Sequence, residues 1–298
     1  MKDAIKVGFC VAYDWSLLEY ALPRVYAESD VIWISMDRKR KTWAGNTYIF
    51  DQEAFSILIR DIDTQDKIKI YEDDFSLSKL TAGENEVRQR NILADKMGAD
   101  GWHIQLDCDE YFVHFSEFVK YLKSLRRNAY NFNVCCPLVT LFKQVEDGFL
   151  YSIPDTKDNI EYIQIATLNP DYHYGRRNGD FNIYTNFLIV HQSWARSEYE
   201  IQQKIENWGH NQDFSKDDFL NQWKSLDKSN YMQLSNFHPL IPEVWSKLNF
   251  IKSTTVKDLL VSFDDRNFPS LNSLQLIIRN SLFISRLKMI WKKVKGLF

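Results

Sequence analysis

The chain has 298 residues, of which 45% are hydrophobic and 15% aromatic, enough for one large packed domain, alone or with an appendage. Its formal net charge of −3 and isoelectric point near 6.1 argue against a general nucleic-acid binder, which would be basic. The four cysteines have no zinc-ligand spacing, and we find neither a signal peptide nor a run of about 18 apolar residues. We therefore expect a cytoplasmic protein with unpaired thiols.

The first part of the chain alternates between predicted strands and helices. Four apolar runs predict buried strands: 5–13, 30–37, 67–75 and 102–106. Three segments have the apolar spacing of helices: 17–29, 84–98 and 116–125. Thr81 and Glu84 form a capping box at the start of the second helix. The alternation predicts an α/β fold with a Rossmann-like, mostly parallel central sheet flanked by helices.

The pattern changes beyond the last of these helices. Two further apolar runs predict strands at 133–142 and 182–191. The polar segment 155–180 between them predicts an irregular loop near the site. Ser197, in a second capping box, and Ser215 each predict the start of another helix.

The strand 102–106 leads into the acidic turn, residues 107–110, with the sequence Asp-Cys-Asp-Glu. Loops at the carboxyl ends of strands form the ligand crevice of an open parallel sheet. Asp107 and Asp109 are two residues apart, so both carboxylates can face one side and hold Mg²⁺ or Mn²⁺. The alternative for the two aspartates is a capped, solvated loop. Glu110 has three possible roles: a metal ligand, a residue next to the metal site, or a solvated acid.

The run 82–112, AGENEVRQRNILADKMGADGWHIQLDCDEYF, resembles the nucleotide-sugar-binding core of family-two glycosyltransferases, which have the GT-A fold. In that family, a helix with an Arg-Asn pair precedes a strand that ends in a D-x-D motif. Arg90, Asn91, Asp107 and Asp109 match these positions. The likeness follows the chain order from the first predicted strand through the third helix and weakens beyond it.

The resemblance implies a role for each matching residue. Tyr13, Asp14 and Asp37 follow or end the first two strands and would lie near the base and ribose of the nucleotide. Asp107 would lie near the ribose or the metal, and Asp109 would coordinate the metal that bridges the diphosphate. The divalent cation would neutralise charge on the departing nucleoside diphosphate.

Further candidates lie on the helix and on the late strand. Arg88 and Arg90 are candidates for phosphate contacts, because a guanidinium binds phosphate oxygens in pairs; an ordinary helix surface is the alternative, above all for Arg88. The resemblance places Asn91 with Arg90 at the nucleotide sugar. His191 stands in an H-x-x-W-x-R-S context that resembles related bacterial transferases and implies a third metal ligand. The alternative for His191 is a structural histidine that is hydrogen-bonded at the end of a strand. For His210 we expect an interaction with a helix C-terminus.

An inverting transferase needs a base that takes the proton of the acceptor hydroxyl. Family-two enzymes usually supply it from an acidic motif after the D-x-D, and this chain has no clear Glu-Asp pair there. Asp180 and Asp171 are the available acids, and we predict Asp180 as the base. Trp194 and Arg196 are candidates for the acceptor side, with core packing and solvent exposure as their respective alternatives.

Residues 281–298 predict a basic amphipathic helix, in which apolar residues near one stripe are flanked by five lysines and arginines. Such a helix with a tryptophan is typical of an interfacial membrane anchor, and docking on its own domain or a partner is the alternative. We predict a catalytic domain over 1–245 and a helical C-terminal extension over 246–298, peripheral on the cytoplasmic face of a membrane.

The sequence as a whole predicts a metal-dependent glycosyltransferase. It would move a sugar from a nucleotide-diphosphate sugar to a saccharide or lipid-linked saccharide acceptor, as in the synthesis of cell-surface polysaccharide or lipopolysaccharide. A nucleotidyltransferase is an alternative, although VAYDWSLLEY lacks the glycine-rich phosphate loop expected after the first strand. A non-catalytic carbohydrate- or lipid-binding module on the same fold is the other.

Overall fold

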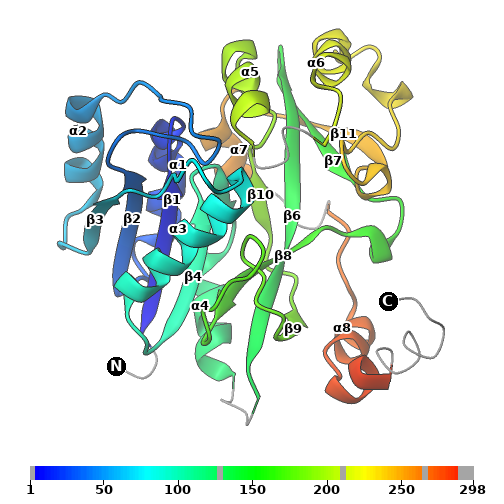
Figure 1. The fold of residues 1–298 in the computed structure, drawn as a ribbon. Coiled ribbons are helices and arrows are strands. Elements are labelled where there is room, and N and C mark those ends of the chain that lie inside the picture. The colour runs from blue at the N-terminus through cyan, green and yellow to red at the C-terminus, as the bar shows by residue number, and fades with distance from the viewer. Residues whose placement is uncertain (1–3, 126–129, 209–212, 264–267, 288–298) are drawn as a thin grey trace.

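A computed structural model describes residues 4–125, 130–208, 213–263 and 268–287. In these residues, eleven strands form one sheet (Figure 1). One half of it is parallel, in the order β3 (Ile68–Asp73), β2 (Val31–Asp37), β1 (Ile5–Val11) and β4 (Trp102–Asp107). The other half continues antiparallel through β8 (Tyr162–Thr167), β6 (Phe132–Val145), β7 (Gly148–Ile153) and β11 (Lys247–Lys252).

Three short strands join the sheet beside β6: β5 (Glu110–Phe112), β9 (Phe181–Tyr184) and β10 (Ile189–His191). Both β9 and β10 run parallel to β6, and β10 also pairs with β5. The predicted fold class, an α/β protein with a Rossmann-like central sheet flanked by helices, is confirmed.

Helices cover both faces of the parallel half. These are α1 (Leu18–Val25), α2 (Gln52–Ile62), α3 (Ala82–Met97) and α4 (Phe115–Ser124). Alternate residues of β1 face opposite sides: Val7 and Phe9 lie in the main core with α1, and Cys10 packs against α3. Gly8 allows α3 to approach closely, because a Cβ there would lie 2.8 Å from Sδ of Met97.

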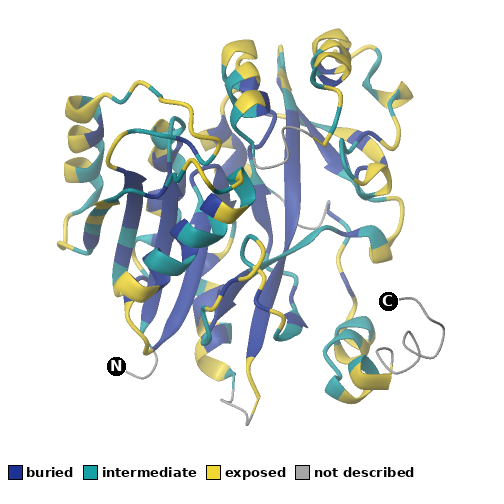
Figure 2. Ribbon diagram, in the orientation of Figure 1, coloured by how far each residue is buried: buried dark blue, intermediate teal, exposed yellow. Residues whose placement is uncertain are grey.

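A second core supports the helices that follow the sheet. Its helices are α5 (Glu198–Asn207) and α6 (Lys216–Ser225), whose buried residues pack around Phe142, Trp194 and Trp245. Figure 2 shows the buried strands between helices whose outer faces are exposed. The predicted capping boxes at α3 and α5 and the Ser215 cap of α6 are confirmed.

Two predictions for the second half of the chain are wrong. The loop expected at 155–180 contains β8, which joins the parallel half of the sheet to β6. The strand expected at 182–191 is two strands, β9 and β10, which pair with separate stretches of β6. Pro137 lies between these stretches and has no N–H to donate, which favours the break.

The predicted C-terminal extension begins with a strand of the main sheet. β11 pairs with β7, and Leu259 and Leu260 of α7 (Val256–Ser262) lie in the main core. Helix α8 (Ser273–Arg279), further along the chain, has no buried residue. Among the described residues, no helix is long and apolar enough to cross a membrane.

Candidate functional site

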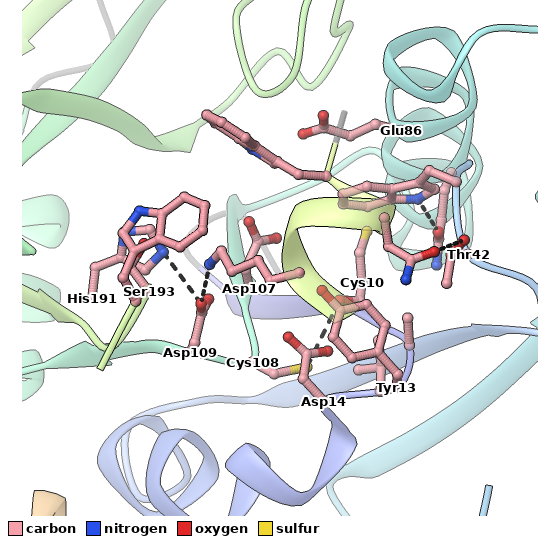
Figure 3. A pocket seen from close by; sticks show the side chains of 18 of the residues that line it. Cys10, Tyr13, Asp14, Thr42, Glu86, Asp107, Cys108, Asp109, His191 and Ser193 are labelled. Carbon is pink, nitrogen blue, oxygen red and sulfur yellow. Dashed lines mark hydrogen bonds and ion pairs between the residues drawn. The ribbon is translucent and has the colours of Figure 1, made fainter. Parts of the chain in front are cut away.

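A cavity of about 210 Å³ lies at the carboxyl ends of β1 and β4 (Figure 3). One part of the lining comes from residues 10–14, residues 41–43 and α3, and residues 107–109 also line the cavity. Aromatic residues of the second core form another part, and α5 contacts both Thr42 and Asp109. The cavity therefore has the position that open α/β sheets use for ligands.

Helix α5 closes one side of this cavity. Asn207, in its last turn, accepts hydrogen bonds from Oγ1 of Thr42 at 2.8 Å and Nδ2 of Asn46 at 3.0 Å. These bonds join α5 to the loop after β2, so residues about 160 positions apart frame one opening.

Each carboxylate of the acidic turn is paired with an arginine. Asp107 accepts from Arg90 at 2.8 Å, and Asp109 contacts Arg196 directly. Glu110 accepts two hydrogen bonds of 2.6 Å from Arg176, one to each oxygen.

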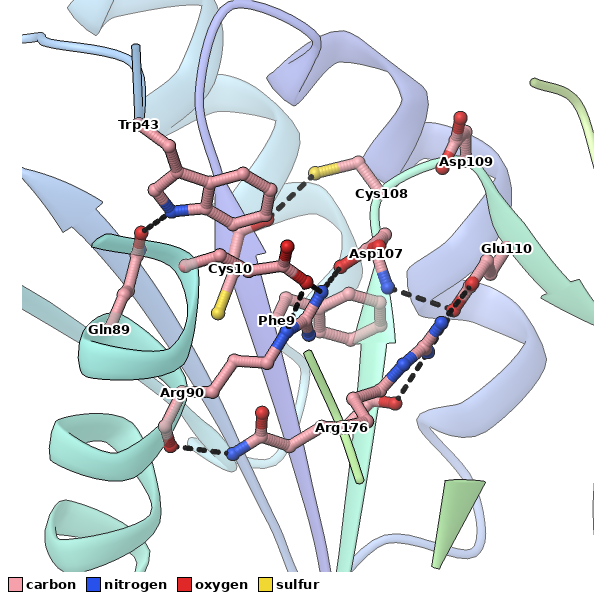
Figure 4. Close-up of polar contacts among 12 residues, drawn as sticks. Phe9, Cys10, Trp43, Gln89, Arg90, Asp107, Cys108, Asp109, Glu110 and Arg176 are labelled. Atoms are coloured by element: carbon pink, nitrogen blue, oxygen red, sulfur yellow. Dashed lines mark hydrogen bonds and ion pairs between the residues drawn. The ribbon is translucent and has the colours of Figure 1, made fainter. Parts of the chain in front are cut away.

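Figure 4 shows two of these pairs side by side. The Glu110 side chain is only 2% exposed, so the solvated alternative for it is wrong.

Asp109 has the densest set of cationic neighbours. Its Oδ2 contacts Arg196, lies 3.1 Å from Nζ of Lys204 and lies 3.3 Å from Nε2 of His191. Burial opposes ionisation of Asp109, but Lys204, His191 and Arg196 together hold its pKa well below the usual value. Asp109 is therefore a buried carboxylate that stays charged and faces a cavity.

Asp14 and Tyr13 line the cavity beside Asp109. Arg196 contacts Asp14 at 3.4 Å as well as Asp109, so one guanidinium bridges the loop after β1 and the acidic turn. Burial raises the pKa of Asp14, and Arg196 only partly offsets it. The structure thus brings Tyr13, Asp14, Asp109 and His191 together in the lining of one cavity.

Asp107 lines the cavity, and Arg90 of α3 pairs with it from outside the lining. Arg90 is 1% exposed, pairs with both Asp107 and Glu86, and its guanidinium lies 5.6 Å from the Trp43 ring centre. Burial works against ionisation of Asp107, but Arg90 and then Arg176 lower its pKa. Asp107 lines the cavity, but its guanidinium partner already supplies the counter-charge that we expected from a metal.

Three predicted nucleotide contacts, Asp37, Arg90 and Asn91, lie outside the cavity lining. The Asp37 carboxylate accepts backbone N–H groups of Lys39, Lys41, Phe75 and Ser76, and so holds two loops together. Asn91 makes two hydrogen bonds of 2.8 Å with the backbone of Tyr172. Arg88 also has a structural role, because it donates hydrogen bonds to the backbone oxygens of residues 74 and 75.

The predicted base lies away from the cavity. Asp180 accepts from Nδ2 of Asn169 at 3.0 Å and directly precedes β9, which pairs with the first residues of β6. The cavity lies at the opposite end of the parallel strands, so Asp180 is not placed to act there. Asp171 is exposed and pairs with His173, and His210 lies outside the described residues.

The residues fit only part of a divalent-cation site. Among the described ranges, no three acidic, histidine or cysteine side chains gather as a metal site, and Asp107 is turned to Arg90. Asp109 and His191 remain as a carboxylate and an imidazole that converge on one point. Mg²⁺ typically takes one or two protein carboxylates and completes its shell with water and phosphate, so this pair fits such a shared site.

One part of the cavity lining is aromatic, and it includes a carboxylate that the sequence analysis did not identify. Trp194, Trp208, Trp245 and His238 line it together with Glu161. Nε1 of Trp245 donates to Oε2 of Glu161 at 3.1 Å, and burial raises the pKa of this carboxyl. Trp194 is buried in the second core, as the core-packing alternative predicts, and it also lines the cavity.

Arg196 and Lys204 also acquire roles that the sequence did not show. Arg196 is 1% exposed, so the solvent-exposed alternative is wrong. Lys204 is the only basic residue of the α5 sequence EYEIQQKIEN. This isolated cation was the one sequence feature that could have pointed to it as a site residue.

No protein-family model matches the chain, and no curated protein is similar to it. Among solved structures, it is similar to one titled "Crystal structure of 4-diphosphocytidyl-2C-methyl-D-erythritol synthase". The TM-score is 0.30 and the identity 9%, over 55% of this chain and 73% of that chain. Because the likeness is so distant, we assign no residue role in this protein from it.

Proposed function

We propose that the protein is a glycosyltransferase that uses a nucleotide-diphosphate sugar. The observation that carries the proposal is that Asp109, His191 and Lys204 meet in a cavity lined by Tyr13 and Asp14 at one part and by aromatic residues at another. The part with Tyr13 and Asp14 would take the nucleoside, the part with Asp109 the diphosphate, and the aromatic part the acceptor. Tryptophan rings suit the apolar faces of sugar rings, which supports a saccharide acceptor.

The charge balance supports a divalent cation, Mn²⁺ or Mg²⁺, that arrives with the donor. The ion pairs around the acidic turn join five carboxylates to four lysine and arginine cations. A diphosphate would add negative charge to this site without compensation. Asp109 and His191 would hold the cation, which would supply stabilisation of the leaving diphosphate.

Glu161 replaces Asp180 as the proposed base. It lines the aromatic part of the cavity, whereas Asp180 lies outside it. Its raised pKa brings it nearer to neutral pH, where a base both accepts and releases a proton readily. The hydrogen bond from Trp245 to Oε2 would orient the carboxylate toward an acceptor hydroxyl.

Calorimetric titration with uridine, guanosine and cytidine diphosphates, each with and without Mn²⁺, tests the donor site. We expect metal-assisted binding of one diphosphate, its loss in Asp109→Asn, and its retention in the control Asp180→Asn. Mass spectrometry with a panel of nucleotide sugars then tests turnover. Glu161→Gln should retain nucleotide binding and lose transfer, and binding of no nucleotide under any condition would refute the proposal.

Two alternatives give different results in the same experiments. A nucleotidyltransferase would release pyrophosphate from a nucleoside triphosphate, but β1 is followed by residues 12–16, AYDWS, without a glycine-rich loop. A non-catalytic binding module would retain a saccharide without turnover of any donor.

We further propose that the C-terminal segment binds an anionic membrane surface, as the sequence predicts. Leu274 and Ile277 of α8 and Phe283 after it are 65–72% exposed, and they precede basic residues that lie outside the described part of the chain. Asn280 ties α8 to Tyr184 of β9, away from the cavity (Figure 1). Deletion of 281–298 should abolish sedimentation with phosphatidylglycerol vesicles; unchanged sedimentation would remove this claim.

A further inference from the structure

Lys204 and Arg196 contact the same oxygen of Asp109 from different sides. Arg196 is 1% exposed, does not line the cavity and also holds Asp14 at 3.4 Å. Lys204 lines the cavity, is 12% exposed, and has Asp109 as its one carboxylate partner among the described residues. Arg196 is therefore fixed within the protein, whereas Lys204 covers Asp109 on the side where a ligand enters.

The ammonium group of Lys204 occupies a position that a metal ion would need. Its Nζ is 3.1 Å from Oδ2 of Asp109, and Nε2 of His191 is 3.3 Å from the same oxygen. A divalent cation held by Asp109 and His191 would meet this positive charge at close range, and the repulsion between them is strong in a partly desolvated site. The metal ion and the Lys204 ammonium would therefore compete for the Asp109 carboxylate.

The chemistry of lysine allows it to leave. Its side chain is a flexible four-carbon stem with three rotatable donors, whereas the planar guanidinium of Arg196 is held by two carboxylates. The only other described contact of the Lys204 ammonium is with the Trp194 ring, at 5.4 Å.

We propose that Lys204 is an exchangeable counter-ion for the acidic turn. Without ligand it neutralises Asp109; when a diphosphate enters with a divalent cation, Asp109 and His191 would hold the cation and Lys204 would move to the diphosphate oxygens. This inference rests on the proposed function, because it assumes that the ligand is a diphosphate. It assigns one side chain two partners in succession, and the two partners can be measured separately.

Lys204→Met should have opposite effects on the two ligands. Removal of the competing ammonium should strengthen binding of Mn²⁺ alone by at least about tenfold, measured from the paramagnetic resonance of free Mn²⁺. The same substitution should weaken binding of uridine or guanosine diphosphate at saturating Mn²⁺ by about tenfold, because one phosphate contact is lost. Lys224→Met is the matched control, since Lys224 is exposed on α6 and should change neither affinity.

Each outcome bears on a different claim. Mn²⁺ binding that is unchanged or weaker in Lys204→Met would overturn the exchange, and so would unchanged diphosphate affinity. If the wild-type protein binds Mn²⁺ but none of the nucleotides, the proposed function fails, whereas a rise in Mn²⁺ affinity would still support the competition with Lys204. Lys204→Gln, a polar neutral variant, provides the same comparison if the methionine variant does not fold.

Discussion

Removal of the Arg176 guanidinium should destabilise the protein through the carboxylate that it leaves behind. Glu110 is 2% exposed and receives two hydrogen bonds of 2.6 Å from Arg176, and one from the backbone N–H of Asp107 at 3.1 Å. In Arg176→Met only the backbone donor remains. Breaking a buried pair by removing one partner costs about 3–5 kcal/mol, a large part of the roughly 5–15 kcal/mol that stabilises most proteins.

A second substitution should recover part of this loss. Adding Glu110→Gln to Arg176→Met removes the unpaired charge and keeps an acceptor for the Asp107 N–H, so the double variant should be more stable than the single one by about 2 kcal/mol. Urea unfolding at pH 7, followed by tryptophan fluorescence, measures both differences. A loss below about 1 kcal/mol in Arg176→Met, or a double variant less stable than the single one, would refute the reasoning.

Three further substitutions test other parts of the structure. Burial lowers the pKa of His103 from 6.5 to about 4, so the unfolded state binds more protons between these values. Stability should therefore fall by about 3 kcal/mol as the pH drops across this window, and His103→Gln should remove that dependence in urea titrations. Gly148→Ala should cost about 2 kcal/mol or more because its Cβ would lie 2.2 Å from the Ile251 oxygen, whereas Gly83→Ala, with open space, should not destabilise. Asp180→Asn should leave the rate of sugar transfer unchanged within about twofold, and a loss as large as that of Glu161→Gln would return Asp180 to the reaction.

The fold of the parallel half was predictable because its signals are local. Strand and helix patterns alternate there, and the Thr81 capping box and the Gly98 C-cap bound α3. The second half was harder because β8, β9 and β10 are short and depend on long-range pairing to β6. In particular, β8 is flanked in the sequence by polar or exposed residues, and it forms a strand because it pairs with both β4 and β6.

The position of the site was predictable, but the partners of its residues were not. The end of β4 identified Asp109, and the end of β10 identified His191. The arginine of Glu110 lies 66 residues away and that of Asp109 lies 87 residues away, in segments with no pattern that ties them to the turn. Glu161 was missed for the same reason: only the folded chain places it beside the aromatic residues from the second core.

The three carboxylates of the acidic turn differ in whether they face the cavity and in which cation they contact. Glu110 lies outside the cavity lining with a bidentate arginine, so its charge is committed to joining the turn to the segment before β9. Asp109 faces the cavity, and one of its cations, Lys204, lies on the ligand side. A substitution at Glu110 should therefore affect stability first, whereas one at Asp109 should affect ligand binding first. The three acids in these four residues thus have different roles. Glu110 stabilises the fold through Arg176, Asp107 lines the cavity and is paired with Arg90, and Asp109 is the carboxylate that can exchange its counter-ion.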